Sequence, residues 1–455
     1  MNLRQQLVTQ PGATGNGAGS TPLPEAAAER DLQAYQRMKS QVHQRLLERL
    51  DLHALEGMPP EHLRQELGSL VERLLAEENL VLNAAERRTL VRDIQHEMVG
   101  LGPLEPLLAD PTVSDILVNG PHQVWVERRG RLSLTDVVFA DDEHLMKIVD
   151  KIVSRVGRRV DESCPMADAR LPDGSRVNVI IPPLALDGAQ MSIRRFAVVP
   201  LTMDDLVENR SLTPSMAQLL QAFTRAEVNL LISGGTGSGK TTLLNILSSY
   251  VDAGERIVTI EDAAELQLRQ PHVVRLETRP PNIEGRGEIT QRDLLRNALR
   301  MRPDRIILGE TRGAEALDML QAMNTGHEGS MTTVHANTPR DALSRLENML
   351  AMAGLNVPPR VARTQIASAI GVVVQAGRLS DGRRKVTSIA EVTGMEGDVI
   401  TMQEIFVFKQ TGVSEDGSVR GHFQATGVRP RLMDRLKSRG LSLADNLFDP
   451  SVRWE

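Results

Sequence analysis

The stretch that decides the fold runs from residue 228 to residue 250 and reads VNLLISGGTGSGKTTLLNILSSY. The aliphatic run Val228 to Ser233 predicts a buried strand, and the pattern from Thr242 to Tyr250 predicts a helix. The loop between them has the spacing G-x-x-x-x-G-K-T, in which glycines let successive backbone N–H groups face a phosphate at a helix N-terminus. We therefore predict an α/β fold organised around a phosphate-binding loop.

The predicted nucleotide-binding residues are those of the loop and of the helix start, namely Gly234, Gly235, Thr236, Gly237, Ser238, Gly239, Lys240, Thr241 and Thr242. Lys240 is expected to reach the β- and γ-phosphates of ATP, and the Thr241 hydroxyl is expected to ligate Mg²⁺. A glycine-rich turn that binds nothing is the alternative, and the strand and helix on either side disfavour it. ATP and Mg²⁺ are therefore the predicted cofactors.

Acidic residues follow two later aliphatic strands, at the strand ends where α/β sheets bind ligands. Glu261 and Asp262 are expected to hold Mg²⁺ or to orient the attacking water, although a Glu-Asp pair taken alone favours a helix N-cap. Glu310 is predicted to polarise the water. Gly309 stands where an aspartate commonly contacts the metal, so Glu261 or Asp262 is expected to share in contacting Mg²⁺. Which carboxylate is the base stays open.

His327 and His335 flank a predicted strand at residues 331–334. The rival is a zinc site, but the helical zinc-protease spacing would need a histidine where Met331 stands, and cysteine ligands are lacking. A structural role is the other alternative. We predict that the two histidines sense the γ-phosphate.

The composition bounds the function classes. The chain has 455 residues and a net charge of −6, with no long basic block, which disfavours nucleic acid as a partner. Cys164 is the single cysteine, so an intrachain disulfide framework is excluded. Residues 1–10 do not resemble a signal peptide, and no apolar run is long enough to span a bilayer. We therefore expect a cytoplasmic protein that meets the membrane only through partners.

Hydrophobic patterning divides the chain into a disordered lead-in at 1–30, a helical bundle at 31–101, an α+β domain at 102–200 and the phosphate-loop domain at 201–455. Helices are expected around Met38, Val42, Leu46 and Leu50, around residues 63–75, and from Asn83, where Glu86 gives capping-box spacing. The α+β domain is expected to contain a helix at 142–156 and strands at 115–118, 123–126, 132–139, 177–181 and 190–196. The last domain is expected to contain strands at 228–233, 257–260, 305–308 and 331–334, then an antiparallel hairpin at 372–375 and 385–391 with a turn at Asp381-Gly382.

Taken together, the motifs resemble the secretion ATPase superfamily, whose members share a Walker A loop, an Asp box, an atypical Walker B element and a His box in this order. Here they read GGTGSGKTT, TIEDAAE, IILGETR and TGHEGSMTTVHAN. With LPDGSRVN and SIRRF upstream, the sequence looks most like the CpaF-type ATPases of Tad (tight adherence) pili. These are related to type II secretion, type IV pilus and type IV secretion ATPases. The resemblance covers roughly residues 85–445.

The resemblance implies a homo-hexamer in which a PAS-like α+β domain is joined to a RecA-like P-loop NTPase domain, with nucleotide bound between them. Arg176, Arg194 and Arg195 are expected to reach the phosphates; surface salt bridges are the alternative, and which of the adjacent pair points inward is open. Rotation about a linker near Pro200 to Asp205 would drive assembly of a Tad or type IV-like pilus, or secretion, through inner-membrane platform proteins. Whether the motor extends or retracts is open, and so is the role of the helical bundle.

Two other functions are compatible with a phosphate loop. A RecA-like nucleic-acid motor would show salt-dependent DNA binding, which the acidic charge balance disfavours. A nucleotide-gated scaffold would bind ATP and barely hydrolyse it, which the complete set of acidic elements disfavours.

Overall fold

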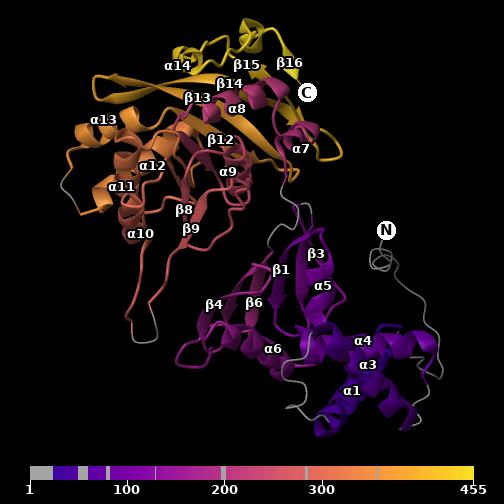
Figure 1. Cartoon of the computed structure of the whole chain (residues 1–455). Helices are drawn as coiled ribbons and strands as arrows, with labels where there is room; N and C mark the ends of the chain where they lie inside the picture. The colour runs from indigo at the N-terminus through magenta and orange to yellow at the C-terminus, as the bar shows by residue number, and fades with distance from the viewer. Residues whose placement is uncertain are drawn as a thin grey trace.

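The computed structural model describes residues 24–49, 60–77, 82–128, 130–195, 201–281, 285–354 and 357–454. These residues form an α/β fold with an amino-terminal helical region, a six-stranded sheet and a ten-stranded sheet (Figure 1). No helix in this described part of the chain has the length and hydrophobicity needed to cross a membrane.

The helical region consists of α1 (Pro24–Arg49), α3 (Pro60–Glu77) and α4 (Ala84–Val99). Their apolar faces enclose a small core, to which Val42, Leu46, Val71, Leu74 and Ile94 contribute. The predicted capping box is confirmed, because the Asn83 side chain accepts from the Glu86 backbone N–H and the Glu86 carboxylate accepts from Asn83 N–H.

The lead-in predicted for residues 1–30 was too long. Helix α1 begins at Pro24, and residues 25–30, EAAAER, are strong helix formers that composition alone assigned to the lead-in. Residues 1–23 and Leu50 lie outside the described residues.

A buried carboxylate fastens the helical region to the six-stranded sheet. Glu97 of α4 contacts Lys39 of α1 at 2.7 Å and His144 of α6 (Asp142–Arg155) at 2.9 Å. Burial opposes ionisation of Glu97, but hydrogen bonds and ion pairs with His144 and Lys39 prevail and lower its pKa to about 2. Lys151 of α6 donates to three backbone carbonyls at the end of α4.

The six-stranded sheet is antiparallel throughout, in the order β3-β2-β1-β6-β5-β4. Short elements, η2 (Gly102–Leu104) and α5 (Glu105–Ala109), precede it, and α6 packs its apolar side on one face. The strands are β1 (Val113–Asn119), β2 (Val124–Arg128), β3 (Arg131–Leu134), β4 (Met166–Arg170), β5 (Arg176–Ile180) and β6 (Gln190–Arg194).

Two predictions for this sheet were wrong. Strand β4, sequence MADAR, was missed because its residues have low strand propensity; it is held by pairing with β5. Strand β3 was expected to reach Phe139 but ends at Leu134, and Phe139 instead fills the core from a loop. Phe196 lies outside the described residues.

The ten-stranded sheet has the order β16-β15-β14-β13-β12-β7-β11-β10-β8-β9. The segment from β12 to β9 is parallel, and β13 to β16 are antiparallel. The parallel strands are β7 (Leu230–Gly234), β8 (Ile257–Glu261), β9 (Val273–Glu277), β10 (Arg305–Leu308), β11 (Met331–Val334) and β12 (Val372–Arg378). The others are β13 (Arg384–Glu396), β14 (Val399–Val413), β15 (Val419–Ala425) and β16 (Arg453–Trp454).

Helices cover both faces of the parallel segment (Figure 1). Alternate residues of a strand pack on opposite faces of the sheet, since Leu230 and Ile232 belong to one buried cluster and Leu231 belongs to the other. One side has α7 (Met203–Glu208), α8 (Pro214–Arg225), α9 (Lys240–Ser248), α14 (Met433–Ser438) and η3 (Asp445–Phe448). The other has α10 (Gln291–Ala298), α11 (Glu315–Asn324), α12 (Pro339–Met352) and α13 (Pro359–Ala369).

The predicted hairpin is confirmed, because β12 and β13 pair antiparallel with Asp381 and Gly382 in the turn between them. Strands β9 and β14 to β16 were missed, since they mix charged and apolar residues without a clear alternation. Pro200 of the expected linker lies outside the described residues. Residues 202–205 of that linker start α7 with a capping box, in which Thr202 is the N-cap and Asp205 is its partner.

Candidate active site

The glycine-rich loop lies between β7 and α9, at the carboxyl edge of the parallel strands. Gly239 takes the N-cap position of α9 with φ of 94°, a left-handed conformation that favours glycine. Gly234 must also be glycine, because a Cβ there would lie 2.3 Å from the Ala376 carbonyl oxygen of β12. The loop therefore presents the positive N-terminal end of α9 to the mouth of the sheet.

Lys240 lies at the base of this loop and is only 7% exposed. Its Nζ donates to the Gly235 carbonyl oxygen at 3.0 Å and lies 3.3 Å from His335 Nε2. Burial lowers the pKa of Lys240, and the charge of Glu310 opposes this shift only in part. The Lys240 side chain is held inside the loop by its contacts with Gly235 and His335.

A chain of charged contacts continues from Lys240 across the ends of β11, β10 and β8. His335 Nε2 lies 3.2 Å from Glu310 Oε1, and Arg312 Nη2 donates to Glu310 Oε2 at 2.8 Å. Arg312 Nη1 then lies 3.3 Å from Asp262 Oδ2. Burial first, and repulsion from Lys240 second, lower the pKa of His335, which favours its neutral form. The parallel topology therefore brings these groups, which are far apart in sequence, into one network.

Glu261 explains why residue 309 is glycine. A Cβ at Gly309 would lie 2.9 Å from Glu261 Cγ, so the Glu261 side chain occupies the space that a residue-309 side chain would need. Glu261 Oε1 accepts from the backbone N–H groups of Glu265 and Leu266, but Oε2 is buried without a hydrogen-bond partner. Burial raises the pKa of Glu261 to about 7, against the lowering effect of those two N–H groups.

The residues expected to hold Mg²⁺ fit that ion. A magnesium ion bound with phosphates and water needs only one or two protein carboxylates. Glu261, with its unpartnered Oε2, ends β8, and Asp262 follows it, at the edge of the sheet where Thr241 is the second residue of α9. Within the described ranges, no group of three or more histidine, cysteine or acidic side chains could hold a metal by itself.

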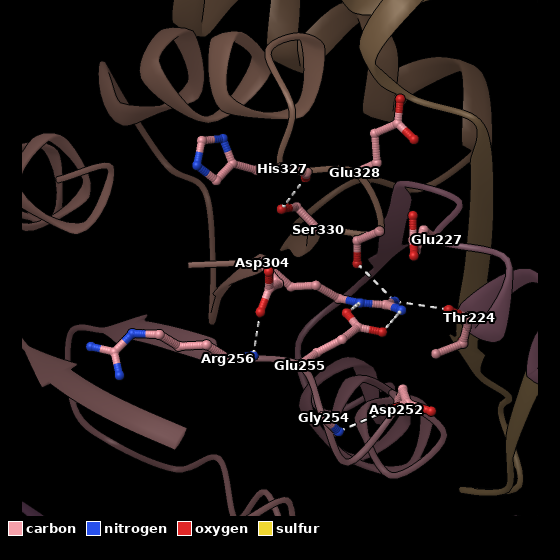
Figure 2. A network of polar contacts seen from close by, with 12 residues as sticks. Thr224, Glu227, Asp252, Gly254, Glu255, Arg256, Asp304, His327, Glu328 and Ser330 are labelled. Carbon is pink, nitrogen blue, oxygen red and sulfur yellow. Dashed lines mark hydrogen bonds and ion pairs between the residues drawn. The ribbon is translucent and has the colours of Figure 1, made fainter. Parts of the chain in front are cut away.

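The two histidines of the predicted sensor lie at opposite ends of β11, so the prediction for His327 was wrong. His335 follows the strand and reaches the phosphate loop. His327 precedes it, and Figure 2 shows His327 in the loop where Ser330 Oγ donates to the His327 carbonyl oxygen at 2.7 Å. The strand separates this histidine from Lys240, and the structural alternative fits it.

A buried arginine organises the edge of the sheet where His327 lies. The Arg305 side chain is fully buried, and its Nη2 donates to Glu255 Oε1 at 2.7 Å. Arg305 Nη1 donates to the carbonyl oxygens of Thr224 and Gly329, which joins the start of β10 to α8 and to the loop before β11. This network anchors the fold at the edge opposite the phosphate loop.

Arginines of the six-stranded sheet form a row on adjacent strands. Arg170 pairs with Arg176 across β4 and β5, and Arg176 pairs with Arg194 across β5 and β6. Arg176 Nη1 donates to Glu265 Oε1 at 2.9 Å, and Arg170 Nη1 lies 2.9 Å from Glu277 Oε2. These contacts join the two sheets.

The adjacent pair of arginines divides between two roles. Arg194 faces the phosphate loop closely enough for its charge to lower the pKa of Lys240, after the larger effect of burial. Arg195 points the other way, and its Nη1 donates to the backbone carbonyl oxygens of Asp110 and Val113. Of this pair, whose orientation the sequence left open, Arg194 lines the cleft, whereas the Arg195 guanidinium is directed to the backbone of its own sheet.

A cleft of about 1070 Å³ separates the two halves of the site. Arg176 and Arg194 line it from the six-stranded sheet, and Asp262 and Arg312 line it from the ten-stranded sheet. Sequence reasoning missed Arg312 and Arg170. Arg312 is two residues from Glu310 in IILGETR and was within reach of that reasoning, whereas Arg170 lies on the strand that was not predicted.

Comparisons with known proteins agree with these motifs. The family described as "Type II/IV secretion system protein" matches residues 97–419, and "Type II secretion system protein E, N-terminal domain" matches residues 35–99. A putative conjugal transfer protein of Mycobacterium tuberculosis is 39% identical over 336 residues, covering 72% of this chain and 94% of that protein.

Type IV secretion proteins show a weaker likeness. The VirB11 protein of Brucella suis is 32% identical over 301 residues, covering 60% of this chain and 83% of that protein. The crystal structure of a Brucella suis VirB11 ATPase in complex with sulphate is 29% identical and has a TM-score of 0.35, with 64% of this chain and 95% of that chain covered.

Proposed function

This chain belongs to the type II/IV secretion system protein family, and from that premise we propose that it hydrolyses ATP with Mg²⁺ at the phosphate loop. The observation that carries the proposal is the contact of Lys240 with His335, and of His335 with Glu310, at the mouth of the parallel sheet. These groups come from three separate strand ends. A cation beside a carboxylate and a largely neutral imidazole, next to a helix N-terminus, suits a triphosphate and an attacking water.

In the proposed mechanism Lys240 binds the β- and γ-phosphates, and the amides of the loop bind the phosphate oxygens. Glu310 orients the attacking water and accepts its proton, while Arg312 and His335 fix the two oxygens of its carboxylate. Mg²⁺, when bound, would supply charge neutralisation for the phosphates. Glu261 Oε2, which lacks a partner, would face the metal side together with Asp262 and the Thr241 hydroxyl.

We further propose that the phosphate-loop half is RecA-like and the six-stranded half PAS-like, and that the protein works as a homo-hexamer. Arg176 and Arg194 would stabilise the γ-phosphate from across the cleft that both line, and the contact of Arg176 with Glu265 in the facing half supports this role. Binding of ATP would then draw the two sheets together, and loss of phosphate would release them.

The biological role that we propose is assembly of a Tad or type IV-like pilus, or secretion, through inner-membrane platform proteins. The family description and the likeness to type IV secretion proteins support the coarser role, and the CpaF-type motifs support the Tad role. The motor would work on the cytoplasmic side, peripheral to the membrane. A nucleic-acid motor is the weaker alternative, because the family description names secretion and the net charge is −6.

The test is ATP turnover by the purified protein and by Lys240→Ala. We expect the variant to lose turnover by about 100-fold, because a preorganised cation at the phosphates is removed. Lys147→Ala is the matched control, since the Lys147 side chain is exposed and forms an ion pair with Glu143 on the outer face of α6. Unchanged turnover in Lys240→Ala would refute the proposed site. Light scattering with bound nucleotide tests the hexamer, and a monomer at high concentration would argue against it.

A further inference from the structure

Two arginines outside the four sequence motifs lie on the phosphate loop. Arg378 and Arg384 stand directly opposite each other across β12 and β13. Arg384 Nε donates to the Gly237 carbonyl oxygen at 2.9 Å, and a Cβ built on Gly237 would lie 3.5 Å from Arg378 Nη1. The hairpin therefore holds two guanidinium groups at the rim of the loop.

Like charges at directly opposed positions of an antiparallel pair repel each other unless an anion lies between them. In this structure that anion is Glu127 of β2, in the other sheet. Glu127 Oε1 lies 3.8 Å from Arg384 Nη2 and 4.0 Å from Arg378 Nη2. The guanidinium of Arg378 also donates to the Gly130 carbonyl oxygen in the turn after β2.

Glu127 extends the row of charged residues that faces the phosphate-loop half. It pairs with Asp115 across β2 and β1, and Asp115 pairs with Arg194 across β1 and β6. The row thus changes sign along the sheet: Arg176 meets a carboxylate across the cleft, whereas Glu127 meets two arginines. Both ends of the row join the two sheets.

The ion pairs of Glu127 with Arg378 and Arg384 are weak enough to break and form again. The Arg378 and Arg384 side chains are 33% and 45% exposed, and ion pairs of this length and exposure are weak. A polyphosphate carries more negative charge than one carboxylate and accepts guanidinium hydrogen bonds well. It would bind within reach of the same two guanidinium groups, because Arg384 already touches the loop.

We propose that Glu127 is a positioning residue that competes with the nucleotide phosphates for Arg378 and Arg384. Before nucleotide binds, Glu127 neutralises the two arginines and ties β2 to the phosphate loop. When phosphate takes the arginines, β2 loses this contact while Arg176 and Arg194 are drawn toward the phosphate, so occupation of the loop changes which strands of the six-stranded sheet it holds. This inference rests on the proposed function, since it assumes that the loop binds ATP.

The experiment compares the full-length protein with Glu127→Gln. Removing the competing carboxylate should tighten binding of a fluorescent ADP analogue and lower the KM for ATP, each by about threefold, with a smaller change in kcat. A role confined to folding would not lower KM. Glu127→Asp keeps the charge with a shorter reach and should give intermediate values. In Glu127→Gln combined with Arg378→Gln and Arg384→Gln, the gain in affinity should disappear.

Glu143→Gln is the matched control, because it breaks an exposed ion pair with Lys147 on α6 and leaves the two hairpins untouched. We expect its nucleotide affinity and KM to equal those of the wild type. An unchanged or higher KM in Glu127→Gln, with normal turnover by the wild type, would overturn the proposed competition by Glu127 and leave the proposed function standing. A wild-type protein that neither binds nor hydrolyses ATP would overturn the proposed function as well.

Discussion

Glu261→Gln should make the protein more stable above neutral pH while impairing its activity. The Glu261 side chain is 3% exposed, and burial raises its pKa from the usual 4.5 to about 7. Glutamine has almost the same shape, and its amide oxygen can keep the two backbone N–H donors that now bind Oε1. The substitution therefore removes the buried charge without opening a cavity.

The sign and size of the effect follow from proton linkage. Below pH 4.5 the carboxyl is protonated in both the folded and the unfolded chain, so it has no effect on stability. Between pH 4.5 and 7 the unfolded chain ionises while the folded chain keeps its proton, and stability falls as the pH rises. Above pH 7 the full penalty remains. A shift from 4.5 to about 7 corresponds to about 3 kcal/mol at most.

Thermal unfolding at pH 5, 6, 7 and 8 measures this effect. We expect little difference between Glu261→Gln and wild type at pH 5, and a melting temperature higher by roughly 6–12 °C in the variant at pH 8. Glu415→Gln, at an exposed carboxylate, is the control and should show no trend with pH. Magnesium nucleotide should stabilise the wild type more than the variant, because the metal relieves the buried charge. A difference that is independent of pH, or a less stable variant at pH 8, would refute the reasoning.

Two further predictions separate neighbouring residues that the sequence placed in one class. His335→Gln should lower kcat by about 100-fold, because it removes the imidazole that contacts both Lys240 and Glu310, whereas His327→Gln should leave kcat within about twofold. Steady-state ATP turnover measures both variants, and equal losses would contradict the structural separation of the two histidines. Arg194→Gln should lower kcat by at least about tenfold with an unchanged melting temperature. Arg195→Gln should instead lower the melting temperature, because the hydrogen bonds of Arg195 to backbone carbonyls are lost. The reverse pattern would show that the two guanidinium groups have been assigned wrongly.

The buried parallel strands were predictable because helices cover them on both sides, whereas the partly exposed parallel strand β9 was missed. A strand buried on both faces is rich in aliphatic and β-branched residues, as in residues 305–308 and 331–334, and such runs stand out in a sequence. The antiparallel part has no such signal. Strand β14, which reads VITMQEIFVFKQTGV, alternates only in part, and its pairing with β13 and β15 determines its structure. Local pattern therefore predicts the strands that position the site and misses those that flank it.

The candidate site was predictable as far as strand order determines it. Glu310 and His335 each follow a parallel strand, so the sequence could place them at one edge. The predicted strand at 331–334 already implied that His327 and His335 lie at opposite edges of the sheet, because its four residues separate those edges. The positions of Arg378 and Arg384 depend instead on how their two strands pair. Arg378 and Arg384 meet only because β12 and β13 pair in one particular register, which no local pattern specifies.

The glycine at position 309 shows how one departure from a motif follows from packing. An aspartate there would place its Cβ 2.9 Å from Glu261 Cγ, so the Glu261 side chain would have to shift. Glu261, at the end of β8, is buried; burial raises its pKa, and its Oε2 has no hydrogen-bond partner in the protein. A group that is costly to ionise alone gains most from a bound cation, so the packing that disfavours an aspartate at 309 makes Glu261 depend on the metal it is proposed to face.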